Sequence, residues 1–321
     1  MSDQFERELA DWGPEALANG RVATLMEAEA YTRRIATTHY ENFTVVSWLL
    51  PKHLRPHFHN VYAYCRWSDD LGDEVGDRTR AAELLDWWQS ELEDCYQGTT
   101  RHPVFVALAE TIREFNIPME PFADLLSAFQ QDQRILQYET FDQLRDYCRR
   151  SADPVGRLVL YLGRQHNEEN VLLSDNVCTG LQLANFWQDV DRDWDIGRRY
   201  LPLEDFEQFG YTREEFERRE TNPAFLKLMQ FEVERARTFL TDGLPLITRL
   251  PGRLQVDIEL FIRGGLKILE RIERIGYSVW ETRPVVTKAD AARMFAGCVI
   301  RATGRRLRPR RSIAPHEHTT G

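Results

Sequence analysis

The chain has 321 residues, of which 42% are hydrophobic and 29% are charged. This globular composition excludes disordered and fibrous proteins, and the length is at the upper end of what one core usually supports. Acidic residues outnumber Lys and Arg by 51 to 41, which gives a formal net charge of −10. That excess argues against nucleic acid as a partner and favours bound cations.

The sequence carries no sign of export or of a membrane span. Its five cysteines are scattered, odd in number and without a CxxC pair, which suits a reducing cytosol. The first ten residues are polar and acidic, unlike a secretory signal, and no apolar run approaches 18 residues. We therefore expect a cytoplasmic protein, either free or peripheral on the inner face of the membrane.

Helical patterns run along the whole chain, whereas the alternating β-branched runs typical of strands are almost absent. In chain order, the spacing predicts helices over residues 22–38, 56–74, 81–96, 103–115, 121–134, 141–150, 154–163, 172–195, 222–241, 254–275 and 288–301. No Pro-, Gly- or Ser-rich stretch marks a domain boundary. We predict one all-α domain over residues 21–304, with a flexible head (1–20) and a basic, disordered tail (305–321).

Two predicted helices carry aspartates four residues apart. In the segment 61–77, Asp69 and Asp73 share one helical face with Tyr62 and Arg66.

The second such segment covers residues 180–202. There, Asp189 and Asp193 share a face with Gln182 and Asn185. Neighbouring carboxylates on one face repel each other, and Mg²⁺ relieves that repulsion while also binding substrate phosphates. A single pair of this kind is usually just solvated. Two pairs with matching polar stripes favour a metal site around a diphosphate, which carboxylates alone could not hold.

At these segments the chain resembles the squalene and phytoene synthase family. The matching pieces are YAYCRWSDDLGDE and QLANFWQDVDRDWDIGRRYLP. A third piece lies upstream, where His39, Phe43 and the Leu50–Pro51 pair resemble the family's H-x-x-x-F…LP element. The resemblance covers roughly residues 31–286.

The resemblance implies a single-domain, all-α isoprenoid synthase (terpenoid synthase) fold, with helices around a central apolar cavity. It implies Mg²⁺, with Mn²⁺ as an alternative, and a prenyl diphosphate substrate at the cavity mouth. The metal ligands it implies are Asp69, Asp73, Asp189 and Asp193. Asp70 ranks lower, because it lies about 100° off the stripe.

The resemblance also assigns residues to the substrate. Those that would contact the diphosphate or the prenyl chains are His39, Phe43, Tyr62, Arg66, Gln182, Asn185, Arg198 or Arg199 with Tyr200, and Arg283. Aromatic walls could favour a carbocation through cation–π contact. The candidates for these walls are Phe43, Tyr62, Trp67, Phe129 and Phe186.

Three departures from the family pattern indicate which branch of the family the chain resembles. Gln188 stands before Asp189 where the family often has Arg, and Pro154 replaces a small residue. Arg149 stands where we place a family tyrosine implicated in the chemistry, so we count it among the catalytic candidates. With these residues, the chain is most similar to the hopanoid-pathway branch of the family, the hydroxysqualene synthases.

That branch implies conversion of presqualene diphosphate to hydroxysqualene by water, and a functional link to other squalene and hopanoid enzymes. NADPH is not expected. The alternative within the family is head-to-head condensation of two farnesyl or geranylgeranyl diphosphates to presqualene diphosphate, squalene or phytoene. Outside it, we weigh a terpene cyclase, a metal-dependent nucleotide hydrolase and a non-catalytic helical scaffold.

Two further features stand apart from the motifs. Gly264 and Gly265 interrupt a helical pattern, which indicates close helix approach, room beside a cavity, or a kink. The end of the chain is basic, and it is either a solvated tail or a contact for an anionic membrane surface. Its arginines are Arg301, Arg305, Arg306, Arg308, Arg310 and Arg311.

Overall fold

The computed structural model describes residues 2–38 and 51–307, with side chains described as far as Thr303. The helices in these ranges are α1 (Asp3–Trp12), α2 (Pro14–Ala18), α3 (Leu25–Thr38), α5 (Arg55–Asp73), α6 (Arg78–Tyr96), α7 (Pro103–Phe115), α8 (Glu120–Asp132), α9 (Phe141–Ser151), α10 (Asp153–Leu162), α11 (Glu168–Gln188), α12 (Val190–Asp195), α13 (Leu203–Phe209), α14 (Arg213–Glu217), α15 (Pro223–Asp242), α16 (Leu246–Arg249), α17 (Leu254–Arg274) and α18 (Lys288–Leu307). The described residues contain no strand, only an isolated bridge between Gln137 and Arg199. The predicted all-α class is confirmed.

The helices begin where local chemistry favours a start. Prolines occupy the first turn of α5, α7, α8, α10 and α15, as the sequence indicated. Side chains cap other starts. Asp77 accepts from the backbone N–H of Arg80 at α6, and Thr140 accepts from that of Gln143 at α9.

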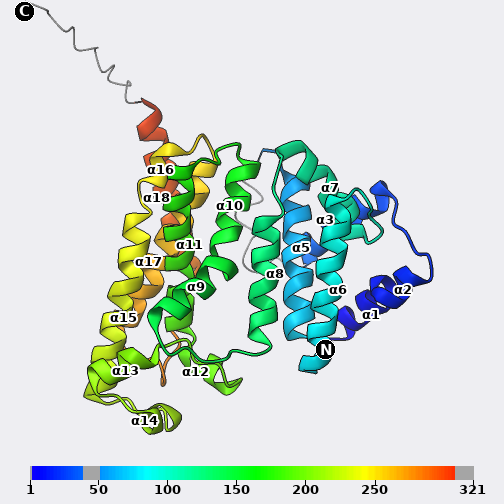
Figure 1. Ribbon diagram of the computed structural model, residues 1–321. Coiled ribbons are helices and arrows are strands. Elements are labelled where there is room, and N and C mark those ends of the chain that lie inside the picture. The colour runs from blue at the N-terminus through cyan, green and yellow to red at the C-terminus, as the bar shows by residue number, and fades with distance from the viewer. Residues whose placement is uncertain (1, 39–50, 308–321) are drawn as a thin grey trace, which may run out of the picture.

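The buried apolar side chains form two large clusters. One draws on α1, α3 and α5–α8 and includes Trp67 and Trp88. The other draws mainly on α9, α11, α13, α15 and α17 and includes Trp187 and Phe225. Figure 1 shows these two groups of helices side by side, with α10 between them. Because α11 packs against α10, α15 and α17, most of its faces are covered.

The second aspartate segment is not one continuous helix. The sequence predicts a helix over 172–195, but α11 ends at Gln188 and α12 begins at Val190. Asp189 stands at the break with φ −110° and ψ 16°. The backbone N–H of Asp193 still donates to the carbonyl of Asp189 at 2.8 Å, so the two aspartates stay one turn apart.

The head of the chain differs from the expected flexible segment, because residues 3–18 fold into α1 and α2. Phe5 is 4% exposed and meets Trp67 edge-on, with ring centroids 5.4 Å apart, and Leu17 is also buried. These two apolar side chains pack the segment against the rest of the protein, which its polar composition did not predict. Of the predicted tail, residues 308–321 lie outside the described residues.

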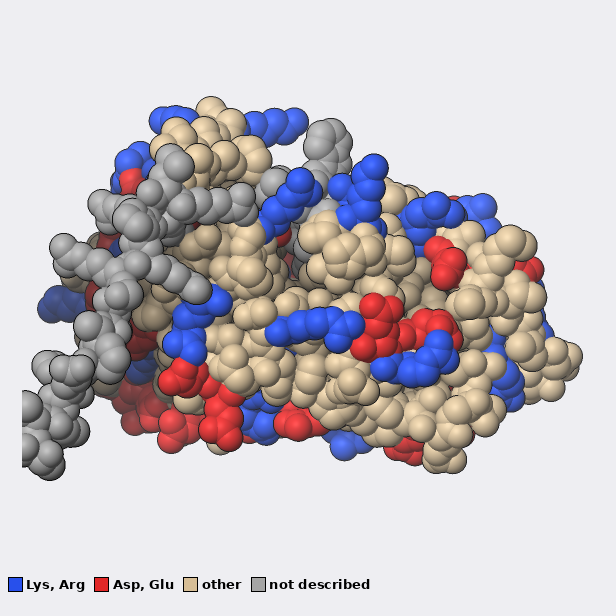
Figure 2. Space-filling model, turned by 90° about the horizontal axis from the view of Figure 1, so that it is seen from above, with Lys and Arg blue, Asp and Glu red and all other residues tan. Residues whose placement is uncertain are grey.

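Different helices form the two ends of the bundle. The C-terminal end of α5 lies at the same end of the bundle as α12, and α16 lies at the opposite end (Figure 1). Figure 2 looks down on the α16 end, where Lys and Arg side chains are spread over the face and acidic side chains lie both along one edge and between the basic ones. No helix within the described ranges has an apolar stretch long enough to cross a membrane.

Candidate active site

The first aspartate pair lies on the last two turns of α5. Asp69 is half-buried and Asp73 is exposed. Burial and the neighbouring carboxylate of Asp73 raise the pKa of Asp69 to about 6, against the opposing charges of Arg66 and Arg198. The spacing of four residues therefore produces the like-charge crowding that the sequence predicts.

Asp70 is held in an ion pair on another side of the same helix. Nε of Arg66 donates to Oδ2 of Asp70 at 3.0 Å, and Nη2 of Arg66 lies 2.5 Å from Oδ1. Both residues line a small hollow against α1, beside Phe5. Arg66 also lies 3.5 Å from Oδ2 of Asp69. Asp70 thus neutralises Arg66 and faces α1.

The second aspartate pair is shaped by the helix break. Nδ2 of Asn185, on α11, donates to Oδ2 of Asp189 at 3.0 Å. Burial and the carboxylate of Asp189 raise the pKa of Asp193 to about 7, against the charges of Arg198 and Arg283. The second pair therefore shows the same crowding as the first.

Arg198 lies between the two pairs. Its Nη2 donates to Oδ1 of Asp73 at 2.7 Å, 125 residues away in sequence. Its charge also acts on Asp69 in the first pair and on Asp193 in the second. A single guanidinium therefore connects both aspartate motifs, and it demonstrates that the fold brings them together.

Arg283 approaches from the segment between α17 and α18. It donates to both carboxylate oxygens of Asp189, and the bond from Nη2 to Oδ2 measures 3.0 Å. The next residue is anchored too, because Nε2 of Gln188 donates to the carbonyl of Pro284 at 2.5 Å. The second motif thus acquires its own arginine from a distant part of the chain.

Buried aromatic rings pack beside the aspartates. The rings of Phe186 and Tyr200 stack with centroids 3.6 Å apart and planes 9° from parallel. Tyr138 and Tyr147 lie 5.9 and 6.1 Å from the Tyr200 ring. All four side chains are at most 8% exposed. We call these four residues the aromatic layer.

Asp132 is a site residue that the sequence did not reveal. The Tyr147 hydroxyl donates to its Oδ2 at 2.8 Å, and Asp132 is 8% exposed. Burial raises the pKa of Asp132 to about 7, opposed by Arg198 and by the Tyr147 bond, while Asp73 and Asp69 add to the rise. In the sequence, a single aspartate at the polar C-terminal end of a predicted helix does not indicate a site residue. Tyr147, two residues before the departure from the family pattern at Arg149, was the available clue.

A pocket of about 390 Å³ opens beside Asp73. It lies between the end of α5, the start of α6, the end of α8 and the turn before Arg198. Residues that line it include Asp73, Asp132, Gln133, Leu136, Ile196 and Arg198. We call it the α6–α8 pocket.

Two arginines from the predicted set do not join the aspartates. Arg199 is 3% exposed, lies with its guanidinium carbon 5.3 Å from the Phe206 ring centre, and donates to the Tyr138 carbonyl at 3.4 Å. Of Arg198 and Arg199, only Arg198 faces the aspartates. Arg149 donates to Asp146 at 3.1 Å and lies 3.9 Å from Asp124. Its contacts are with α8 and its own helix.

The remaining predicted residues divide into three groups. Tyr62 is half-buried near Arg66 and Asp69, and burial raises the pKa of its hydroxyl. Gln182 is half-buried on α11. His39 and Phe43 lie outside the described residues.

Among the predicted aromatic walls, Phe186 belongs to the aromatic layer, and Phe129 lies beside Gly72. The assignment of Trp67 to these walls is wrong. Trp67 is 1% exposed, stacks on Trp88 at 5.2 Å and donates to the Tyr31 hydroxyl at 2.9 Å. It belongs to the core because its face of α5 packs against α3 and α6.

The donor set fits Mg²⁺ shared with a diphosphate. Each motif supplies carboxylate oxygens, the ligands that Mg²⁺ prefers. Burial raises the pKa of Asp69 and Asp193, the neighbouring carboxylates of Asp73 and Asp189 add to the rise, and a cation would relieve that repulsion. Within the described ranges, no three His, Cys, Asp or Glu side chains converge on one point.

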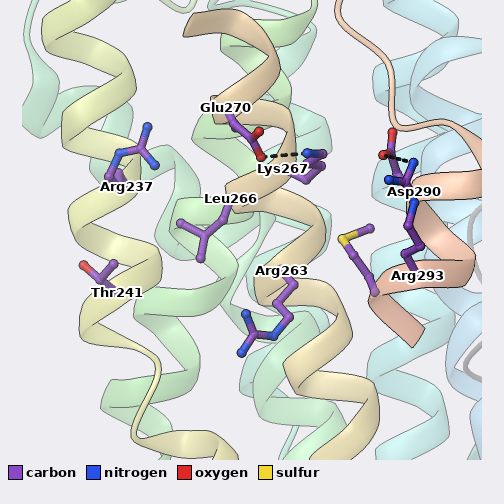
Figure 3. Close-up of a pocket in the computed structure, with 9 residues that line it drawn as sticks. Arg237, Thr241, Arg263, Leu266, Lys267, Glu270, Asp290 and Arg293 are labelled. Carbon is purple, nitrogen blue, oxygen red and sulfur yellow. Dashed lines mark hydrogen bonds and ion pairs between the residues drawn. The ribbon is translucent and has the colours of Figure 1, made fainter. Parts of the chain in front are cut away.

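A larger hollow, of about 530 Å³, lies on another face between α15, α17 and α18. Figure 3 shows its lining side chains, with ion pairs joining Lys267 to Glu270 and Arg293 to Asp290. It contains none of the predicted site residues. Each of its four basic side chains already pairs with a carboxylate: Arg237 with Glu234 and Glu273, Arg263 with Glu259, Lys267 with Glu270, and Arg293 with Asp290.

Comparison with known proteins agrees with this geometry. A family model described as squalene/phytoene synthase matches residues 19–290. The chain belongs to the squalene/phytoene synthase family. A hydroxysqualene synthase of Rhodopseudomonas palustris is 35% identical over 73% of this chain and 80% of that protein. A phytoene synthase of Arthrospira platensis is 30% identical over 82% of this chain and 90% of that protein.

Solved structures of the family agree on the fold. The squalene synthase HpnC from Alicyclobacillus acidocaldarius is 46% identical, with a TM-score of 0.75 over 79% of this chain and 95% of that one. A dehydrosqualene synthase in complex with a ligand is 22% identical, with a TM-score of 0.77. The predicted all-α isoprenoid synthase fold is therefore confirmed. As a squalene/phytoene synthase family member, the protein is an enzyme of isoprenoid synthesis that acts on prenyl diphosphates.

Proposed function

We propose that this enzyme converts presqualene diphosphate to hydroxysqualene, with loss of diphosphate and with Mg²⁺ as cofactor. The observation that carries the diphosphate site is the position of Arg198 among Asp69, Asp73 and Asp193. The choice of reaction rests on the 35% identity to a hydroxysqualene synthase and on the departures at Arg149 and Pro154.

The arginines are proposed to hold the leaving group. Arg198 and Arg283 pair with Asp73 and Asp189 through bonds that a diphosphate could replace. Charge-assisted bonds from such arginines would orient the diphosphate and favour its departure. Arg66 is half-buried and carries its charge close to Asp69. It would add a third donor near the first motif.

The carboxylates are proposed to hold the metal ion between protein and diphosphate. Asp69 and Asp73 would bind from α5, and Asp189 and Asp193 from the α11–α12 break. When bound, Mg²⁺ would neutralise the charge that develops on the leaving diphosphate. The protein's own arginines favour the ionised carboxylates: Arg66 and Arg198 oppose the rise in the pKa of Asp69, and Arg198 and Arg283 oppose the rise in the pKa of Asp193.

The aromatic layer is proposed to shelter the cation. Loss of diphosphate would leave a cyclopropylcarbinyl cation beside Phe186, Tyr200 and Tyr147. Aromatic faces attract cations, and buried rings keep bulk water away until the carbon skeleton has rearranged. One water then forms the alcohol, and no reductant takes part.

The test is incubation of the purified protein with presqualene diphosphate and Mg²⁺ in the absence of NADPH. We expect hydroxysqualene and free diphosphate, and we expect no product when EDTA is present. Recovery of presqualene diphosphate from farnesyl diphosphate, with no hydroxysqualene from presqualene diphosphate, would contradict the proposal.

That result would instead favour the second candidate, head-to-head condensation of two prenyl diphosphates. The observation on its side is the match to phytoene synthase over 82% of this chain, a longer stretch than the match to hydroxysqualene synthase. The same assay with farnesyl and geranylgeranyl diphosphates decides between the two, because only a condensing enzyme consumes them.

We also propose that the enzyme is cytoplasmic and contacts the inner face of the membrane through its basic end. The Lys and Arg side chains of the α16 end (Figure 2) support this placement, since they favour an anionic surface. A chain cut after Thr303 should bind less to vesicles that contain anionic lipid than the full chain does. Equal binding of both forms would contradict the role of the tail.

A further inference from the structure

The α6–α8 pocket leads from solvent to Asp132, which is hydrogen-bonded to the aromatic layer. Its outer rim includes Ile196, which is 58% exposed, and its lining reaches inward to Asp132, which is 8% exposed. Asp132 in turn accepts the hydroxyl of Tyr147, a member of the aromatic layer. The pocket therefore leads past Arg198 to Asp132, and a hydrogen bond continues from Asp132 to one ring of the aromatic layer.

The proposed reaction requires such a path, because its product contains an oxygen atom that does not come from the protein. Ionisation breaks the C–O bond to diphosphate and leaves a carbocation. Water then forms a new C–O bond, one of its O–H bonds breaks, and the electron pair of that bond stays on oxygen. A base must accept the proton that this water loses. Other water molecules must be kept from the cation until the cation has rearranged.

Asp132 is placed to take that proton. Its Oδ2 is occupied by the Tyr147 hydroxyl, and the described residues give Oδ1 no hydrogen bond, so Oδ1 is the free acceptor. The charged and titratable groups near it are Arg198 at the pocket side, Asp69 and Asp73 from α5, Tyr147 from α9, and the hydroxyls of Tyr138 and Tyr200. A base whose pKa lies near the working pH is efficient in proton transfer, and Asp132 has a pKa of about 7.

We propose that the α6–α8 pocket admits the water that forms the alcohol, and that Asp132 orients this water and accepts its proton. Tyr147 is a positioning residue, since its bond fixes which carboxylate oxygen is free. The proton leaves Asp132 through the water of the pocket. This inference rests on the proposed formation of hydroxysqualene.

The test separates departure of diphosphate from capture by water. Leu136→Trp narrows the pocket, and Ile135→Trp is the matched control, because Ile135 is 44% exposed and does not line the pocket. Asp132→Asn keeps the size of the side chain and an acceptor for Tyr147 but removes the base. Diphosphate release and the ratio of alcohol to hydrocarbon are measured with presqualene diphosphate and saturating Mg²⁺.

We expect Leu136→Trp and Asp132→Asn to release diphosphate within about threefold of the wild-type rate, while the ratio of alcohol to hydrocarbon falls at least tenfold. The Ile135→Trp ratio should equal that of the wild type. The half-saturating Mg²⁺ concentration should be the same in all four proteins, which shows that the metal site is intact.

An unchanged ratio in Leu136→Trp and Asp132→Asn, with diphosphate release retained, overturns the role of the pocket and leaves the proposed function standing. A wild-type enzyme that yields no alcohol overturns both. If Asp132→Asn does not fold, Leu136→Trp decides, because that substitution lies at the half-exposed lining of the pocket.

Discussion

The guanidinium of Arg198 donates to the carboxylate of Asp73 at 2.7 Å, and this one bond joins the two aspartate motifs. Arg198 lies five residues after Asp193, and Asp73 ends α5. Without a substrate, the positive charge of Arg198 acts on both motifs, on Asp69 in the first and on Asp193 in the second. Under the proposed function, a diphosphate that draws Arg198 away would leave Asp73 to Mg²⁺, and this would couple substrate binding to metal binding.

We expect Arg198→Ala to lower turnover by about 10²-fold or more, because it removes a preorganised donor at the point where charge develops. Steady-state release of diphosphate from presqualene diphosphate measures the effect. Arg192→Ala is the matched control, because Arg192 lies on α12, is exposed, and should retain wild-type turnover. Equal turnover of the two variants would show that Arg198 does not contact the leaving group.

Asp73→Asn should weaken the metal site more than it weakens the fold. The substitution removes one of the two carboxylates on α5 that we propose as metal ligands, so we expect the half-saturating Mg²⁺ concentration to rise at least tenfold. Asp77→Asn is the control, because Asp77 caps α6 and Asn is an equally good cap. Titration of diphosphate release with Mg²⁺ makes the comparison, and a parallel shift in both variants would argue for a general charge effect.

Asp257 on α17 predicts a dependence of stability on pH. It is 2% exposed, and within the described ranges neither carboxylate oxygen has a hydrogen-bond partner. Burial raises its pKa to about 8, against an ordinary value near 4 in the unfolded chain. Between those values the folded state holds the extra proton, so its contribution to the free energy of unfolding falls as pH rises from about 4 to 8.

Asp257→Asn removes this titration. We expect the variant to be more stable than the wild type at pH 8 by about 1–3 kcal/mol, with the difference shrinking toward pH 4. Urea unfolding at several pH values measures it. Asp242→Asn, an exposed site at the end of α15, should show no such trend. A difference for Asp257→Asn that stays constant with pH would mean that Asp257 is ionised in the folded protein.

The adjacent glycines of α17 should respond oppositely to alanine. A Cβ on Gly265 would lie 2.8 Å from Leu181 Cδ2 and 2.9 Å from Leu240 Cδ1, so Gly265→Ala should destabilise the protein by about 1–2 kcal/mol. A Cβ on Gly264 would meet nothing within 4 Å. Gly264→Ala should stabilise the helix by up to about 1 kcal/mol. Thermal unfolding of both variants checks this, and equal shifts would contradict the close approach.

Helix positions followed from the sequence because each rests on local chemistry. The starts at Pro103 and Phe141 and the end at Tyr96 agree with the predicted bounds. The break at Asp189 did not follow, since nothing in the residues 188–190 opposes a continuous helix. Likewise, the packing of Phe5 against Trp67 depends on a partner more than 60 residues away.

By itself, the sequence determined the all-α class, the two aspartate pairs and the family, because spacing along one helix and long local motifs carry that information. Only the tertiary structure decided which groups meet the aspartates. It selected Arg198 over Arg199, turned Asp70 toward Arg66, and brought Asp132 and Tyr147 to the site. The reason is physical: helix periodicity fixes which face a side chain occupies, whereas the neighbour of that face is set by how distant helices pack.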